Sequence, residues 1–365
     1  MVAGDEQRTL SVSPPTPART TLDPDAESVE STSTRQITLA RRPSGEPTLA
    51  DFQLVESEVP PLGPGQVLVR NTWMSVDPYM RGRMDDVESY IAPFELGAAL
   101  EGGAIGEVVA SQADAVPVGA TVSHFLGWRE HAVVDAAAVV VVDTDLAPAS
   151  AYLGVLGTTG LTAWTALTDI APVREGDVVF VSAAAGAVGS VAGQFARELG
   201  ASRVVGSTGG PVKAQRLLTD LGYDAAIDYK AGPLASQLTA AAPDGIDVYL
   251  DSVGGDHLQA AIDALRPGGR IAMVGAISEY NATDPVPGPH ILYEVAKKEL
   301  ALRGMLVTSF LSAFPAYIAK AAAWLAEGSL HTEETVRDGL DQAPAAFLDM
   351  MRGANIGKML VNLAP

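Results

Sequence analysis

Residues Val179–Gly189 read VFVSAAAGAVG, and this stretch decides the fold class. Its apolar start is typical of a buried parallel strand, and the residues after it have the spacing of a helix. Ala184, Gly186 and Gly189 match an alanine-first form of the pattern G-x-G-x-x-G, which binds a dinucleotide between strand and helix. Gly186 would let the backbone approach the pyrophosphate, and Gly189 would let the helix pack closely against the strand. The alternative is a glycine-rich turn that serves packing alone.

From about residue 150 onward, short apolar runs alternate with helical patterns, which predicts a doubly wound parallel sheet of the Rossmann type. The expected strands are Val178–Val181, Arg203–Val205, Ala225–Asp228, Asp247–Leu250, Gly269–Val274 and Ala301–Val307, and the expected helices are Val188–Leu199, Pro211–Leu221 and one after Ser312. Between Arg35 and Val142, short strand-like segments such as Gln66–Arg70 and Gly102–Val109 are separated by Pro and Gly, which predicts a small β-barrel. The fold class is therefore α/β, with a β-barrel domain and a parallel-sheet domain.

The second strand of the sheet indicates which dinucleotide binds. NAD sites place an acidic residue roughly 20 positions after the glycines, where it binds the ribose 2′-hydroxyl. Arg203–Gly210 contains no acid and offers hydroxyls instead, Ser207 among them. Lys213, one of only six lysines, comes next, and Tyr229 and Lys230 end the third strand. Hydroxyls and a cation suit an additional phosphate, so the pattern favours NADP; the alternative for Lys213 is a solvated charge on a helix face.

The composition of the 365 residues excludes several kinds of site and partner. Without cysteine the chain cannot form a disulfide, an iron–sulfur cluster, a cysteine nucleophile or a cysteine-ligated zinc site. A net charge of −20 opposes binding to nucleic acid or to anionic membranes. No run reaches the roughly 18 apolar residues of a membrane span, and no signal peptide is recognisable, so we expect a cytoplasmic protein. Residues 1–34 are rich in Ser, Thr, Pro and acids, and we expect a disordered tail.

The candidate catalytic groups are tyrosines rather than metal ligands. None of the five histidines has a zinc-ligand spacing, and we expect His124 and His131 to be ordinary polar residues in or beside strands. A carbonyl substrate would then be polarised by hydrogen bonds. Tyr79 lies in the segment VDPYMRGRM, and Tyr280 directly follows a predicted strand of the sheet, at the end where ligands bind. Each tyrosine is a candidate donor, and the alternative for each is a structural role.

Six motifs stand in a characteristic order: Val76–Met84 (VDPYMRGRM), Leu153–Thr162 (LGVLGTTGLT), Ala183–Gln194 (AAAGAVGSVAGQ), Val253–Gly255 (VGG), Gly275–Asn281 (GAISEYN) and Asn355–Lys358 (NIGK). With them the chain resembles the zinc-free medium-chain dehydrogenase/reductases, in the branch of leukotriene/prostaglandin reductases and NADPH-dependent curcumin reductases. The resemblance extends from about Arg35 to Leu363.

This resemblance implies a GroES-like barrel domain made of residues 35–152 and 312–365, with a Rossmann domain, residues 153–311, inserted between its parts. It implies NADPH as cofactor and a small conjugated carbonyl compound as substrate, in a homodimeric enzyme. The implied reaction reduces the carbon–carbon double bond of α,β-unsaturated ketones and aldehydes. Hydride goes to the β-carbon, and a hydroxyl group stabilises the enolate without a metal.

The resemblance also implies roles for individual residues. Tyr280 would stabilise the enolate oxygen, and Tyr79 would line the pocket or donate the proton. The implied cofactor contacts are Ala184, Gly186, Ala187, Val188 and Gly189 at the pyrophosphate, Ser207, Lys213 and Tyr229 at the 2′-phosphate, Asn355 at the nicotinamide end, and Ser252, Gly275 and Ile277 elsewhere in the cofactor site. Ser252 departs from the family pattern, which usually has Asn there, and its side chain has a shorter reach.

Two other functions fit the same sequence. An NADPH quinone oxidoreductase shares the fold and the cofactor, and its conjugated acceptors are chemically similar. A non-catalytic NADPH-binding protein would need the cofactor site but neither tyrosine, so the presence of Tyr79 and Tyr280 weighs against it.

Overall fold

The computed structural model describes residues 33–364. The expected disordered tail therefore lies outside the described residues, apart from Ser33 and Thr34, which already belong to strand β1 (Ser33–Leu39). No helix within the described range is long and apolar enough to cross a membrane.

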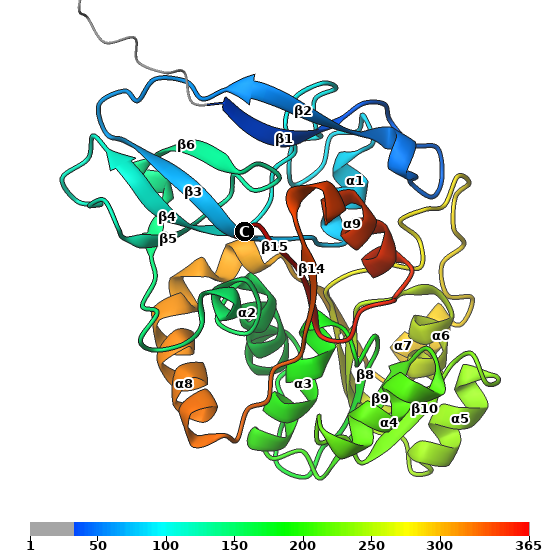
Figure 1. The fold of residues 1–365 in the computed structure, drawn as a ribbon. Helices are drawn as coiled ribbons and strands as arrows, with labels where there is room; N and C mark the ends of the chain where they lie inside the picture. Colours follow the sequence, from blue (N-terminus) through cyan, green and yellow to red (C-terminus); the bar gives the residue numbers. More distant parts are fainter. Residues whose placement is uncertain (1–32, 365) are drawn as a thin grey trace, which may run out of the picture. The chain divides into compact units, whose positions relative to one another are not determined.

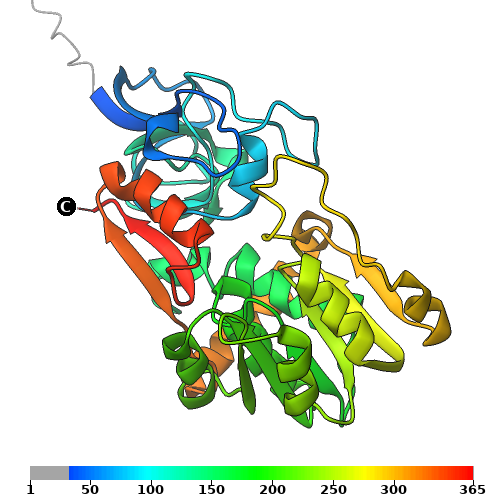
Figure 2. The same ribbon diagram turned by 90° about the vertical axis from the view of Figure 1, so that its right-hand side faces the viewer.

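A six-stranded parallel sheet forms the core of the second half of the chain (Figures 1 and 2). The strand order is β10-β9-β8-β11-β12-β13, so the chain first moves outward from β8 and then returns to the other side of β8. This is the Rossmann order, and ligands bind where the direction reverses, here between β8 and β11. The strands are β8 (Val178–Val181), β9 (Arg203–Thr208), β10 (Ala225–Asp228), β11 (Ile246–Asp251), β12 (Leu265–Met273) and β13 (Ala301–Gly304).

Both faces of this sheet are covered by helices because side chains along each strand alternate between the faces. Val179 and Val181 pack with Phe195 of α3 on one face, whereas Val178 and Phe180 pack with α5 and α6 on the other. The first face carries α2 (Thr158–Thr165), α3 (Ala187–Glu198), α4 (Pro211–Thr219) and α8 (Phe314–Glu327). The second carries α5 (Leu234–Ala241) and α6 (Gly255–Ala264), and α7 (Leu292–Lys297) precedes β13.

A seven-stranded, mostly antiparallel sheet forms the predicted barrel. Its strands are β3 (Gln66–Ser75), β4 (Ala104–Ser111), β5 (Thr121–His124), β6 (His131–Asp135), β7 (Val140–Val141), β14 (Glu334–Asp338) and β15 (Lys358–Asn362). Strand β15, from the C-terminal end of the chain, pairs with β3. A hairpin of β1 and β2 (Phe52–Glu58), with α1 (Tyr79–Arg83) and α9 (Ala343–Met351), accompanies the barrel. The predicted α/β class with a barrel domain and a Rossmann domain is confirmed.

Several element boundaries differ by a few residues from the sequence analysis, and two differences bear on the domains. Strand β13 ends at Gly304 instead of residue 307, because Val307 begins a short 3₁₀ helix, η5 (Val307–Ala313). The return to the barrel was expected at residue 312, but α8 packs with α2 and α3, where its Tyr317 and Trp324 meet Trp164 and Phe195. Pairing with barrel strands resumes at β14.

Candidate active site

The loop between β8 and α3 leaves open space beside Gly186. A Cβ atom placed on Gly186 would have one neighbour within 4 Å, the Ala183 carbonyl oxygen at 3.1 Å. Gly186 is also the residue before α3, whose first-turn amides, Ala187–Gly189, have no acceptor within the helix. Unpaired amides around open space at a helix N-terminus suit an anionic group such as pyrophosphate.

Gly189 and Ala184 have packing roles in the same loop. A Cβ on Gly189 would lie 2.5 Å from the Ala183 oxygen and 2.5 Å from the Cα of Ala184, so only glycine lets α3 approach the loop this closely. The Ala184 amide donates to the Ser207 carbonyl at 2.9 Å, which fixes the loop against the end of β9.

The segment before β15 lies against this loop and brings the NIGK motif to it. The Gly357 amide donates to the Ala185 carbonyl oxygen at 2.8 Å. Asn355 is buried, and its side-chain amide donates to the Gly357 carbonyl at 2.7 Å, within its own turn. The structure thus places Asn355 beside the phosphate loop, and its contact with the nicotinamide stays a prediction.

Two lysines meet beyond the end of β9. The Lys213 ammonium donates to the Gly353 carbonyl at 2.6 Å, and burial, together with the nearby Lys230 ammonium, lowers its pKa. A Cβ on Gly209 would lie 2.8 Å from the Tyr229 hydroxyl and 2.9 Å from Cε of Lys230. Within residues 33–364, Lys297 and Lys358 form ion pairs, whereas Lys213 and Lys230 do not. Two neighbouring cations without a carboxylate favour an anionic ligand.

Ser207 and Ser252 contribute unpaired hydroxyls to the same end of the sheet. Ser207 is fully buried, and the Oγ atoms of both serines have no hydrogen-bond partner among the described residues. Ser252 directly follows β11, and its carbonyl accepts the Ile277 amide at 3.2 Å. Unpaired buried hydroxyls are costly unless a ligand satisfies them, so both atoms fit a polar ligand.

The segment Gly275–Asn281 places Tyr280 over the end of β12. The Tyr280 hydroxyl accepts the Ala276 amide at 3.3 Å, and a Cβ on Gly275 would lie 3.1 Å from that hydroxyl. The structure thus brings Ser252, Gly275, Ile277 and Tyr280 together, as the motifs suggested. Within residues 33–364, the Tyr280 hydroxyl accepts this one hydrogen bond and donates none.

Tyr79 comes from the barrel side, at the start of α1. Its hydroxyl is buried and has no hydrogen-bond partner in the described part of the chain, and its ring stacks on Phe125. Burial, and next the Asp77 carboxylate, raise the pKa of Tyr79 well above its usual value, so the hydroxyl keeps its proton at neutral pH.

Tyr90, in the connection between α1 and β4, was not singled out from the sequence. Tyr90 is 59% exposed, but its partial burial, and next the neighbouring Tyr280, raise the pKa of Tyr90, and Tyr90 in turn contributes to the raised pKa of Tyr79. Three tyrosines thus gather here from separate segments. A lone aromatic residue in a loop gives no local pattern from which this proximity could be predicted.

A partly buried ion pair, which the sequence analysis did not find, joins two of the sequence motifs. The Lys358 ammonium lies 2.5 Å from Asp77 Oδ1 and also donates to the Val76 carbonyl, while the Ser75 hydroxyl donates to Asp77 Oδ2. Lys358 follows Gly357, which contacts the phosphate loop, and Asp77 stands two residues before Tyr79. The pair therefore connects the segment of Tyr79 with the strand that touches the cofactor loop.

The histidines of the barrel behave as expected from the sequence. His124 lies in β5 and is buried; its Nε2 is 2.8 Å from Asn71 Oδ1, and its Nδ1 accepts the Leu126 amide at 3.1 Å. Burial, and next the Arg129 guanidinium, lower the pKa of His124 to about 4. Among the described residues, no group of three or more His, Cys, Asp or Glu side chains could hold a metal ion.

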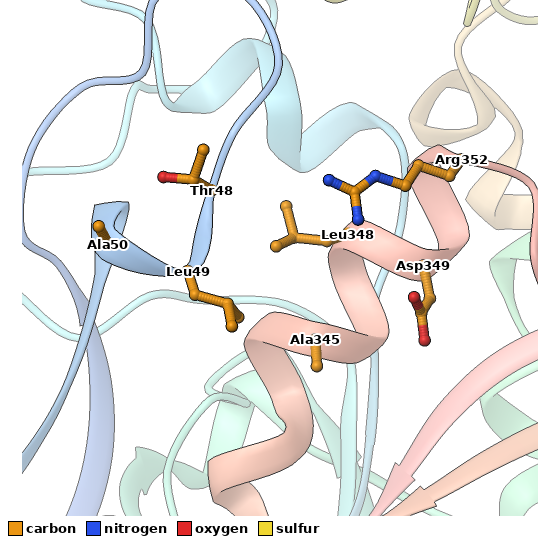
Figure 3. A pocket seen from close by; sticks show the side chains of 7 residues that line it. All are labelled: Thr48, Leu49, Ala50, Ala345, Leu348, Asp349 and Arg352. Carbon is orange, nitrogen blue, oxygen red and sulfur yellow. The ribbon is translucent and has the colours of Figure 1, made fainter.

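A surface groove lies elsewhere, between α9 and the short helix η1 (Leu49–Asp51) (Figure 3). It is lined by Thr48, Leu49, Ala50, Ala345, Leu348, Asp349 and Arg352, none of which is a predicted site residue. Arg352 at its edge pairs with Glu46. The groove contributes nothing to the site described above.

Comparison with protein families and curated proteins gives a consistent assignment. Residues 35–142 match the N-terminal domain of oxidoreductase, and residues 187–327 match the zinc-binding dehydrogenase family. The chain is 45% identical to YfmJ of Bacillus subtilis, an NADP-dependent oxidoreductase by name, over 91% of this chain and 98% of that protein. It is 36% identical to the NADPH-dependent curcumin reductase of Escherichia coli (90% and 97% covered) and 38% identical to prostaglandin reductase 1 of Mus musculus (89% and 97% covered).

Among solved structures, CurA from Vibrio vulnificus in complex with NADPH superposes with a TM-score of 0.87 at 37% identity, covering 91% of this chain and 99% of that one. The sequence matches to these relatives and the superposition on the solved structure both cover nearly the whole described chain. The chain belongs to the zinc-free medium-chain dehydrogenase/reductases, in the branch of prostaglandin reductase and NADPH-dependent curcumin reductase.

Proposed function

We propose that this protein uses NADPH to reduce the carbon–carbon double bond of α,β-unsaturated ketones and aldehydes. The observation that carries the proposal is that Tyr79 and Tyr280, two hydroxyl donors from different domains, both lie near Tyr90, with Tyr280 next to Gly275 and Ser252 at the end of the parallel sheet. Its relatives are named reductases of curcumin and prostaglandin, and the former by name depends on NADPH.

The residues present fit NADPH at three places. The open face of Gly186 and the first-turn amides of α3 suit the pyrophosphate. Lys213 and Lys230 suit the 2′-phosphate, with Tyr229 beside them. The unpaired Oγ atoms of Ser207 and Ser252 suit polar atoms of the nucleotide. When bound, NADPH supplies the hydride that adds to the β-carbon of the substrate.

Tyr280 would stabilise the charge that develops on the substrate oxygen. As the β-carbon gains hydride, the electrons of the double bond move toward the carbonyl and form an enolate. The Tyr280 hydroxyl already accepts the Ala276 amide, so its own proton can be donated to the enolate oxygen. A donor aimed at developing charge in a site shielded from water is an effective means of catalysis.

Tyr79 would supply the second donor. Its hydroxyl is buried, protonated and without a hydrogen-bond partner among the described residues. A buried polar group without a partner costs free energy, so a hydrogen bond from Tyr79 to the substrate would remove that cost. Protonation of the α-carbon, by Tyr79 or by water that it orients, completes the addition of hydride and proton across the double bond.

A panel of enones, enals and quinones with NADPH tests the proposal through loss of reduced-nicotinamide absorbance. Enones or enals should be turned over, and Tyr280→Phe should lower kcat while leaving NADPH binding unchanged. A protein that binds NADPH but reduces none of these compounds would be a binding protein instead, and preference for quinones would favour a quinone oxidoreductase.

On the family resemblance we also propose a cytoplasmic homodimer. Light scattering of the purified full chain tests the oligomeric state, and a monomer at micromolar concentration would contradict it. Cell fractionation tests the location.

A further inference from the structure

Arg81 of α1 joins three segments that are far apart in the sequence. Its side chain is 3% exposed. Nε donates to Asn281 Oδ1 at 3.0 Å, Nη1 lies 2.9 Å from each carboxylate oxygen of Asp85, and Nη2 donates to the Gly45 carbonyl at 2.9 Å. All three nitrogens of this rigid planar group are therefore used, and only one of the partners, Asp85, belongs to its own part of the chain.

Asn281 is the residue next to Tyr280, in a long connection without helix or strand. This connection, residues 274–291, runs from the end of β12 to α7, and residues 282–288 within it are exposed. Within residues 33–364, a single hydrogen bond joins this connection to the barrel side of the molecule, and it is the bond from Arg81 to Asn281. A segment with so little regular structure depends on such contacts for its position.

We propose that Arg81 is a positioning residue that holds the Tyr280 hydroxyl in register with Tyr79 by binding Asn281. Tyr79 stands two residues before Arg81 in α1, so one short helix carries the first donor and fixes the neighbour of the second. The inference rests on the proposed function, in which Tyr280 stabilises the enolate oxygen. Catalytic donors act well only when their supporting contacts fix them to a fraction of an ångström.

If Arg81 only stabilised the fold, its bond to Asn281 would not affect catalysis. Its bidentate pair with Asp85 and its bond to the Gly45 carbonyl would stabilise the barrel without help from Asn281. The Asn281 side chain can therefore be removed while the other contacts of Arg81 stay in place, which separates positioning of Tyr280 from stability of the fold.

The test compares Asn281→Ala, Asn281→Asp and, as the matched control in the same connection, Thr283→Ala. Asn281→Ala should lower kcat for an enone about tenfold, because the donor is no longer held in place, with NADPH affinity and melting temperature unchanged. Asn281→Asp keeps an acceptor for Arg81 and should restore most of the activity. Wild-type kcat in Asn281→Ala, or a loss of the same size in Thr283→Ala, would overturn the proposal.

Two further measurements separate failure of this proposal from failure of the proposed function. In a Tyr280→Phe background, Asn281→Ala should cause no additional loss of kcat; an additional tenfold loss would mean that Arg81 does not act through Tyr280. Amide hydrogen exchange of residues 276–283 should be faster in Asn281→Ala than in the wild type and in Thr283→Ala, whether or not an enone is reduced. Unchanged exchange would refute the positioning contact even if the enzyme reduces enones.

Discussion

Replacing Lys213 with alanine should remove most of the preference for NADPH over NADH. The Lys213 ammonium lies near that of Lys230, and neither has a carboxylate partner among the described residues. A charge-assisted hydrogen bond contributes about 1.5–3 kcal/mol, and because Lys213 is only partly buried we take the lower part, about 1.5–2 kcal/mol. That range corresponds to a roughly 10- to 30-fold weaker Kd for NADPH.

Fluorescence titration with NADPH and with NADH measures this effect directly. The Kd for NADPH should rise as stated, while the Kd for NADH, which lacks the 2′-phosphate, should not change. Lys297→Ala is the matched control, since it removes the same charge from α7, where Lys297 pairs with Glu294. An unchanged ratio of the two Kd values in Lys213→Ala, or equal weakening of both cofactors, would refute the assignment of the 2′-phosphate site.

Four other results are expected from the same structure. Gly186→Ala should weaken NADPH binding without lowering the melting temperature, whereas Gly189→Ala should destabilise the fold by about 1–3 kcal/mol through overpacking; NADPH binding of wild-type strength in Gly186→Ala would contradict this. Between pH 6.5 and 4 the unfolded chain protonates His124 but the folded protein does not, so about 3 kcal/mol of unfolding free energy should be lost as the pH falls through this range. Denaturant titrations of His124→Gln should lack that part of the pH dependence, and an identical slope would contradict it. Lys358→Met should cost about 1–3 kcal/mol, because Asp77 loses its ion-pair partner while it stays 22% exposed and keeps its hydrogen bond from Ser75. Asp77→Asn in the same chain should recover most of the loss in melting experiments, and a double variant as unstable as the single one would argue against the pair. Higher ionic strength should weaken NADPH binding little or even improve it. Salt screens the repulsion between NADPH and charges more than about 10 Å away in a chain of net charge −20, but it screens the direct contacts less. A steep loss of NADPH affinity with salt would count against binding of the phosphate in a local pocket.

The cofactor loop could be predicted because its requirements are local. The turn after strand β8 and the start of helix α3 determine the spacing of Gly186 and Gly189. The apolar strand just before them shows that this turn lies between a strand and a helix. The central strands β8, β9 and β11 could be predicted for the same reason, since burial on both faces leaves a continuous apolar run.

Contacts between distant segments could not be predicted in this way. Lys358 and Asp77 are 281 positions apart, and Arg81 and Asn281 are 200 apart, so only the folded backbone brings them together. The sequence predicted a helix after Ser312 within the part assigned to the barrel domain, but α8 packs on α2 and α3. Tyr90 has no motif around it, and its proximity to Tyr280 follows from the path of a loop.

The central claim is that the protein adds hydride and a proton across a conjugated carbon–carbon double bond. Reduction of an enone with NADPH deuterated at the transferred position, followed by NMR of the product, tests it most directly. We predict deuterium at the β-carbon, a hydrogen from solvent at the α-carbon and an intact carbonyl group. Deuterium on the carbonyl carbon, with the double bond retained, would contradict the account.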